Sequence, residues 1–169
     1  MTAPSITVAE IAKFKPCPGV FARAKKALPK RRKITAADAR EAGISFDDIF
    51  WVLSALARKD SDVDRRLRLW AADCAARVLH IYERTGSSEA PRKAIIASRQ
   101  YARGEIDDAA GDAAGAAAWA AAWAAAWAAA RAAARAAEKA WQFDRLISRM
   151  SDSEPDDWPL DAKAKGETT

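Results

Sequence analysis

The sequence predicts an all-α fold, a multi-helix bundle around one long alanine-rich helix near the C-terminus. Two observations lead to this prediction. The stretch Ala109–Ala140 contains 22 alanines among 32 residues, and alanine has the highest intrinsic helix propensity. Elsewhere, apolar residues recur at helical spacing, and strand-forming residues never alternate with polar ones over a long run.

Length and composition indicate one globular domain with tails. The chain has 169 residues, of which 50% are hydrophobic and 30% charged, which is typical of a folded rather than a disordered protein. We expect three parts within this domain: basic short helices over residues 1–44, the helical core with the alanine helix over 45–150, and an acidic tail over 151–169.

The N-terminal part is predicted from capping signals. Thr7–Glu10 has the spacing of a capping box and predicts a short helix to about Phe14. Val20–Leu28 can form a second short helix. Thr35–Asp38 predicts the start of a third, and Gly43 its end.

Three helices are expected before the alanine tract. Ser45 with Asp48 caps one that runs to about Arg58. Asp60–Arg84 reads as a long amphipathic helix, and Pro91–Arg103 as a third that ends at Gly104. In the long helix we expect four arginines to face water: Arg65, Arg66, Arg68 and Arg77.

The alanine helix itself presents a size conflict. A continuous helix from Asp107 to about Met150 would be about 65 Å long at 1.5 Å per residue. A compact domain of this length is only about 40 Å across. We therefore expect a break or bend near Gly111 and Gly115.

Aromatic residues recur every fourth position along this helix and form one stripe, since each step of four drifts by only about 40°. The stripe consists of Trp119, Trp123, Trp127 and Trp141, with Arg131 and Arg135 on its flank. Three interpretations stay open: a face buried in the core, a face for a partner protein or a second copy, and a pocket that stacks a nucleotide on indole with arginine on its phosphate.

Charge is unevenly distributed. Residues 1–40 carry ten Lys or Arg against two Asp or Glu, whereas residues 151–169 carry two Lys against six acidic residues. We call residues 1–40 the basic head. Its candidate contact loop is Lys30, Arg31, Arg32 and Lys33, which is either solvated or in contact with an acidic partner or a nucleic acid. No zinc or recognition-helix pattern accompanies the loop, so sequence-specific nucleic-acid binding is disfavoured.

Nothing in the sequence indicates catalysis, a metal or a cofactor. Cys74 and His80 lie about 240° apart on one helix, so the imidazole cannot activate the thiol. Asp73 and Arg77, four residues apart, can pair on the helix surface.

We expect a cytoplasmic, non-membrane protein. Two cysteines without metal spacing suit a reducing compartment, and no signal peptide is evident. Ala113–Ala130 is long enough to span a bilayer, but alanine is too weakly apolar for this to be convincing.

Several pieces of the chain, in this order, resemble a family of alanine-rich, fifth-type immunity-protein-like chains found in bacterial toxin–immunity loci and phage genomes. The pieces are Phe50–Leu53, Asp64–Leu67, Ala72–Leu79, Pro91–Ile95, Tyr101–Glu105 and the alanine tract with its spaced aromatics. The resemblance covers about residues 45–147; the basic head and acidic tail depart from it.

The resemblance implies a protein that binds and neutralises a partner protein without catalysis. We therefore expect an immunity or phage counter-defence function against a toxin or host defence effector. Two alternatives stay open: a sponge that sequesters a nucleotide signal between Trp and Arg side chains, and a structural protein that self-assembles into a homo-oligomer.

Overall fold

The computed structural model describes residues 2–28, 32–84, 89–107, 135–153 and 155–160. The chain divides into two compact units. Unit 1 comprises Met1–Leu67 and Phe143–Pro155, and unit 2 comprises Arg68–Gln142 and Asp156–Thr169. The three-part division expected from the sequence stays a prediction.

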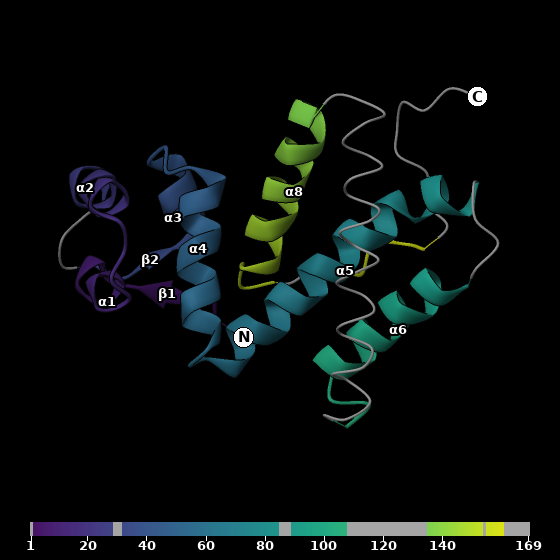
Figure 1. Ribbon diagram of the computed structural model, residues 1–169. Helices are drawn as coiled ribbons and strands as arrows, with labels where there is room; N and C mark the ends of the chain where they lie inside the picture. The colour runs from purple at the N-terminus through teal and green to yellow at the C-terminus, as the bar shows by residue number, and fades with distance from the viewer. Residues whose placement is uncertain (1, 29–31, 85–88, 108–134, 154, 161–169) are drawn as a thin grey trace. The chain divides into compact units, whose positions relative to one another are not determined.

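The elements of unit 1 are short and mostly helical (Figure 1). They are β1 Ser5–Ile6, α1 Val8–Lys13, α2 Pro18–Ala27, β2 Ile34–Thr35, α3 Ala36–Glu41, α4 Phe46–Ala57, the start of α5 Ser61–Glu83, and the second half of α8 Arg135–Arg149. β1 and β2 pair antiparallel, with Ser5 opposite Thr35 and Ile6 opposite Ile34. The sequence did not predict this sheet, because strands of two residues show no alternation.

Each strand of the small sheet leads directly into a capped helix. Thr7 caps α1 and Thr35 caps α3, and both form complete capping boxes with the residue three positions on, Glu10 and Asp38. The predicted capping boxes are therefore confirmed. Gly43 ends α3 at φ +75°, a conformation that favours glycine.

The core of unit 1 gathers around the sheet. Its buried members are Ile6, Val8, Ile11, Ala24, Leu28 and Ile34. Arg23 on α2 binds Asp48 on α4 through both Nε and Nη2, at 3.2 and 2.8 Å from Oδ2, which ties these two helices together. Trp51 on α4 is 38% exposed, so α4 is less completely buried than its apolar sequence predicts.

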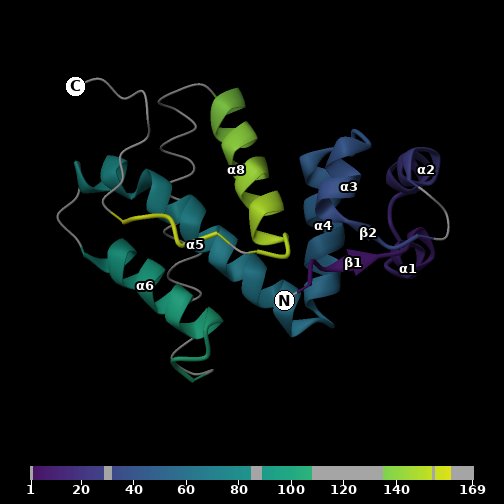
Figure 2. The same cartoon turned by 180° about the vertical axis from the view of Figure 1, so that it is seen from behind.

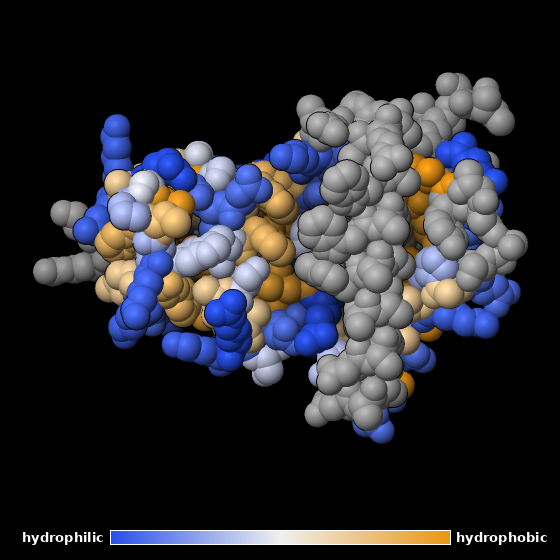
Figure 3. Space-filling model, viewed as in Figure 1, coloured by the Kyte–Doolittle hydropathy of each residue, from blue (hydrophilic) through white to orange (hydrophobic). Residues whose placement is uncertain are grey.

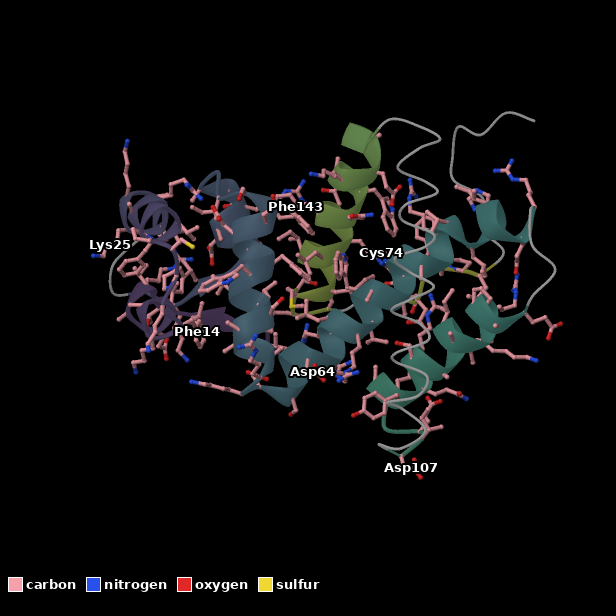
Figure 4. The ribbon with its side chains drawn as sticks, in the orientation of Figure 1. Phe14, Lys25, Asp64, Cys74, Asp107 and Phe143 are labelled. Carbon is pink, nitrogen blue, oxygen red and sulfur yellow. The ribbon has the colours of Figure 1, made fainter. Side chains whose placement is uncertain are left out.

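Phe143 of α8 packs against α4, as Figure 4 shows. Its ring meets Phe46 edge to face at 5.5 Å, and the Arg40 guanidinium lies 4.7 Å from its centroid. Arg40 also pairs with Asp144. One aromatic and one charged residue of α8 therefore join the N-terminal helices of unit 1.

The prediction that Arg66 faces water is wrong. Its side chain is fully buried, and its Nη1 donates to the carbonyl oxygens of Arg149 and Ser151 at 2.9 and 2.7 Å. Asp62 accepts from its Nε at 2.7 Å. The last carbonyls of a helix have no partner within that helix, so the guanidinium is buried because it caps the end of α8.

Unit 2 is built on the rest of α5, the whole of α6 Ala90–Ala102, and the first half of α8. Figures 1 and 2 show α5 and α6 side by side. Their shared core consists of Ala72, Ala75, Ala76, Leu79 and Ile95. Four of the five come from α5, whose alanines let the neighbouring helix approach closely.

The alanine tract falls mostly outside the described residues. The mainly helical fold is confirmed, but the bundle around one long C-terminal helix, and the expected break at Gly111 and Gly115, stay predictions. α8 ends at Arg149, close to the predicted end. No helix within the described residues is long and apolar enough to cross a membrane.

The capping box of α3 gives a stability prediction. Thr35→Ala removes the hydroxyl that accepts from the Asp38 backbone N–H, so the free energy of unfolding should fall by about 1 kcal/mol. Ser54→Ala is the control, because the Ser54 hydroxyl only donates to a carbonyl of its own helix; it should change stability by less than about 0.5 kcal/mol. Urea denaturation measures both, and equal effects would contradict the assignment.

The two capping carboxylates predict an acid dependence of stability. The Thr7 backbone N–H and hydroxyl donate to Glu10 and lower its pKa below 4.5; those of Thr35 lower the pKa of Asp38 below 3.8 in the same way. The folded state therefore releases these protons at lower pH than the unfolded chain. Their stabilisation is present above the ordinary pKa values and is lost as the pH falls through the lowered ones.

Urea unfolding from about pH 7 to about pH 3 should show this loss. The double variant Glu10→Gln/Asp38→Asn should lose less stability than the wild type over the acid part of this range. An unchanged slope in the double variant would show that other groups account for it.

Candidate functional site

Only part of the predicted site lies within the described residues. Six of its members fall outside them: Trp119, Trp123, Trp127, Arg131, Lys30 and Arg31. Arg135 is the first residue of α8. The roles predicted for the stripe and for the basic loop therefore stay predictions, and the described candidates are Trp141, Arg32 and Lys33.

Arg32 and Lys33 lie beside the capping boxes of unit 1. The Arg32 guanidinium binds Asp38 at 2.9 Å and is 69% exposed, and the charge of Lys33 contributes to the lowered pKa of Glu10. Figure 4 shows Lys25 at the outer side of α2, and Figure 3 shows hydrophilic side chains interspersed with apolar ones on the visible surface over α1–α4. Arg32 and Lys33 are thus exposed, and whether the loop contacts a partner stays a prediction.

An apolar cavity of about 50 Å³ lies inside unit 1. Its lining includes Ile11, Ile34, Ile49 and Leu53. Within the described part of the chain, Asp48 is the one charged residue that lines it, and it is bound to Arg23. Since the lining is the core of unit 1 itself, we interpret the cavity as a packing gap.

Trp141 belongs to an aromatic and charged cluster in unit 2. Its indole meets that of Trp158 edge to face at 5.0 Å. The Arg77 guanidinium lies 4.3 Å from the Trp141 ring centroid and 5.4 Å from that of Trp158, and its Nε donates to Glu138 at 2.9 Å. One arginine of α5 thus contacts both indoles, an arrangement in which the ring faces attract the cation.

A buried ion pair joins α5 to α6 next to this cluster. Arg99 Nη2 lies 3.1 Å from Asp73 Oδ1, and the two side chains are 8% and 0% exposed. Charges removed from water at this depth are costly unless further hydrogen bonds satisfy them. The pair therefore requires other polar groups in its surroundings.

The main chain of Trp158 supplies those groups. Its N–H donates to Asp73 Oδ1 at 2.9 Å, and its carbonyl accepts from Arg99 Nη2 at 2.7 Å. Asp157, one residue earlier, pairs with Arg103 and lies 3.5 Å from Arg99 Nε. Figure 2 shows the segment 156–160, in yellow, running along α5.

Side chains of the same segment pack on the core. Trp158 and Leu160 are half-buried against the Ala72–Leu79 cluster of α5 and Ile95, whereas Asp156 and Pro159 are exposed. The site therefore holds one peptide segment by its main chain, one acidic side chain, one aromatic and one aliphatic. We call Asp73, Arg77, Arg99, Arg103 and Trp141 the peptide clamp.

Asp73 and Arg99 are engaged with each other and with a main chain. Cys74, on α5, is half-buried and is labelled in Figure 4. The described part of the chain brings no three His, Cys, Asp or Glu side chains together as a metal ion would require.

Sequence reasoning singled out Asp73, Arg77 and Trp141, but it missed the roles of Arg99 and Arg103. We predicted Asp73 with Arg77, from their spacing; the structure pairs Asp73 with Arg99 and Arg77 with Glu138. The sequence did contain a signal that Asp73 is buried, because Asp73 stands between alanines and a cysteine. An acidic residue in such surroundings is buried only when it is paired.

The clamp predicts a large effect of one substitution. Asp73→Ala leaves the Arg99 guanidinium buried without its carboxylate, which should cost about 3–5 kcal/mol of unfolding free energy. The matched control is Glu89→Gln, which breaks the α6 pair with Lys93, where both side chains are 76% exposed; it should cost less than about 1 kcal/mol. Chemical denaturation that gives both variants similar stability would contradict the buried pair.

No curated protein and no solved structure matches the chain. A family model described as "Imm-5 like putative immunity protein" matches residues 58–143, just over half of the chain. The matched stretch contains the whole of α5 and α6, with all five residues of the clamp. The chain belongs to the Imm-5 like putative immunity protein family.

Proposed function

We propose that the protein is an immunity-type inhibitor that binds a toxin or a host defence effector and neutralises it by occupying it. The observation that carries this proposal is the family match over residues 58–143. It agrees with the resemblance seen in the sequence alone, and an immunity function requires binding rather than chemistry.

The arrangement of charged residues in the matched region supports binding. Asp73 and Arg99 meet the N–H and the carbonyl of one residue, which is how a protein holds another peptide chain. Main-chain hydrogen bonds of this kind give affinity, and side-chain pockets give specificity.

The basic head supports an acidic target. Residues 1–40 carry ten Lys or Arg against two Asp or Glu, and Lys25, Lys26, Arg32 and Lys33 are all exposed. A surface of one sign accelerates encounter with a partner of the opposite sign, and this effect weakens with ionic strength.

A protection assay tests the proposal. The full chain is co-expressed with each of a panel of toxins and defence effectors, above all those encoded next to its own gene or active against phages. We expect one of them to lose its toxicity or its defence and to elute with the chain as a complex. The proposal fails if no member of the panel is neutralised or bound.

The role of the basic head is tested on that complex. The variant Lys25→Gln/Lys26→Gln/Arg32→Gln/Lys33→Gln should slow association about tenfold or more at low salt, and much less at about 0.5 M salt. The control variant Arg58→Gln/Lys59→Gln/Lys93→Gln/Lys139→Gln removes the same charge from exposed positions outside the head. Equal slowing in both variants would assign the effect to net charge and not to the head.

A further inference from the structure

The peptide clamp makes a different contact with each of several successive residues of the segment 157–160. Its acidic position, held by Arg99 and Arg103, is filled by Asp157. The next position, Trp158, is held by its main chain and by its indole. The position after that, Pro159, is exposed, and Leu160 packs on the apolar cluster.

We propose that this clamp is the site at which the protein captures a partner's acidic–aromatic–any–aliphatic segment, and that its own residues 157–160 fill the site until the partner displaces them. The inference rests on the proposed function for the nature of the partner and deepens it by stating the partner's chemistry. The contacts to the main chain do not depend on which chain supplies the segment. The tail is therefore a built-in competitor for the partner.

The tail fills the clamp incompletely, which makes its displacement favourable for a better ligand. At the clamp, two buried nitrogens have no hydrogen-bond partner among the described residues, Arg99 Nε and Trp158 Nε1. The Asp157 carboxylate stops 3.5 Å from Arg99 Nε, beyond a good hydrogen bond. A glutamate at this position reaches one methylene further and can accept from Arg99 Nε.

The indole nitrogen of Trp158 bears on which aromatic residue the clamp accepts. Because Trp158 Nε1 makes no hydrogen bond within the described residues, a phenylalanine at this position loses no hydrogen bond. The clamp should therefore accept either aromatic. The clamp should discriminate strongly between residues at the acidic position, which faces Arg99 and Arg103. It should discriminate weakly at the position of Pro159, which is exposed.

The proposal is tested with a fluorescein-labelled peptide of residues 152–163 and the full chain. The receptor is a tail-cleared variant, Asp157→Ala/Trp158→Ala/Leu160→Ala, compared with the wild type by fluorescence anisotropy. A tethered segment competes at an effective concentration of the order of millimolar. We therefore expect the peptide to bind the tail-cleared chain at least tenfold more tightly than the wild type.

Matched controls identify the clamp as the binding site. Arg103→Gln in the tail-cleared chain should weaken peptide binding several-fold. Arg92→Gln on the same helix, where Arg92 pairs with Glu83, should leave it unchanged. A peptide with Glu at position 157 should bind more tightly than the native one, one with Phe at position 158 should bind within about twofold, and one with Ala at 157 and 158 should not bind.

Two results would overturn the inference: a folded tail-cleared chain that does not bind the peptide, or one that binds the native and the doubly substituted peptides equally. If circular dichroism shows the tail-cleared chain unfolded, Asp157→Asn serves as receptor. It should bind the peptide at least threefold more tightly than the wild type, and no gain overturns the proposal. Neutralisation of an effector without any peptide binding would remove this inference and leave the proposed function standing.

Discussion

A carboxylate and a guanidinium that are both removed from water, at Asp73 and Arg99, must find their remaining hydrogen-bond partners inside the protein. Two helices alone do not provide them, because their own backbone groups bond within each helix. The N–H and carbonyl of Trp158 do. The position of the segment 156–160 in unit 2 thus depends on the desolvation of one ion pair.

Unit 1 also contains buried arginines that donate to main-chain carbonyls, but there they bind the end of a helix and the chain after it. Arg66 is buried at the end of α8 and donates to the carbonyls of Arg149 and Ser151, while the Arg149 guanidinium donates to the carbonyl of Pro155 at 3.0 Å. Arginine suits both places, because its planar group presents several donors at once and stays charged when buried. In unit 1 the donors of Arg66 cap the end of α8, and Arg149 holds the chain that follows it. In unit 2 such donors hold a segment that carries its own acidic and aromatic side chains.

The residues of the clamp all lie in the region that matches the family model. An immunity protein acts through the surface it presents to a partner, and the family match covers the helices that carry the clamp. The basic head lies outside the match. The clamp inside the matched region and the basic head outside it would have different roles in the proposed inhibition, in which charge governs the rate of encounter and buried contacts govern the lifetime.

The sequence by itself determined the local structure. Thr7 and Thr35 mark helix starts because side-chain capping is a matter of residues three apart, and Gly43 and Gly104 mark ends because few other residues adopt a positive φ. The long amphipathic helix at Ser61–Glu83 followed from apolar spacing. The mainly helical class and the family followed as well.

Only the tertiary structure decided which charges meet. Asp73 has Arg77 four residues away, yet its carboxylate pairs with Arg99, 26 positions on in the chain, and Arg66 is buried against residues more than 80 positions away. Sequence spacing predicts pairs on one helix surface, where an exposed pair contributes little. Buried pairs such as Asp73 with Arg99 affect stability far more. Which residues are buried depends on how the helices pack, and a local sequence pattern does not contain this information.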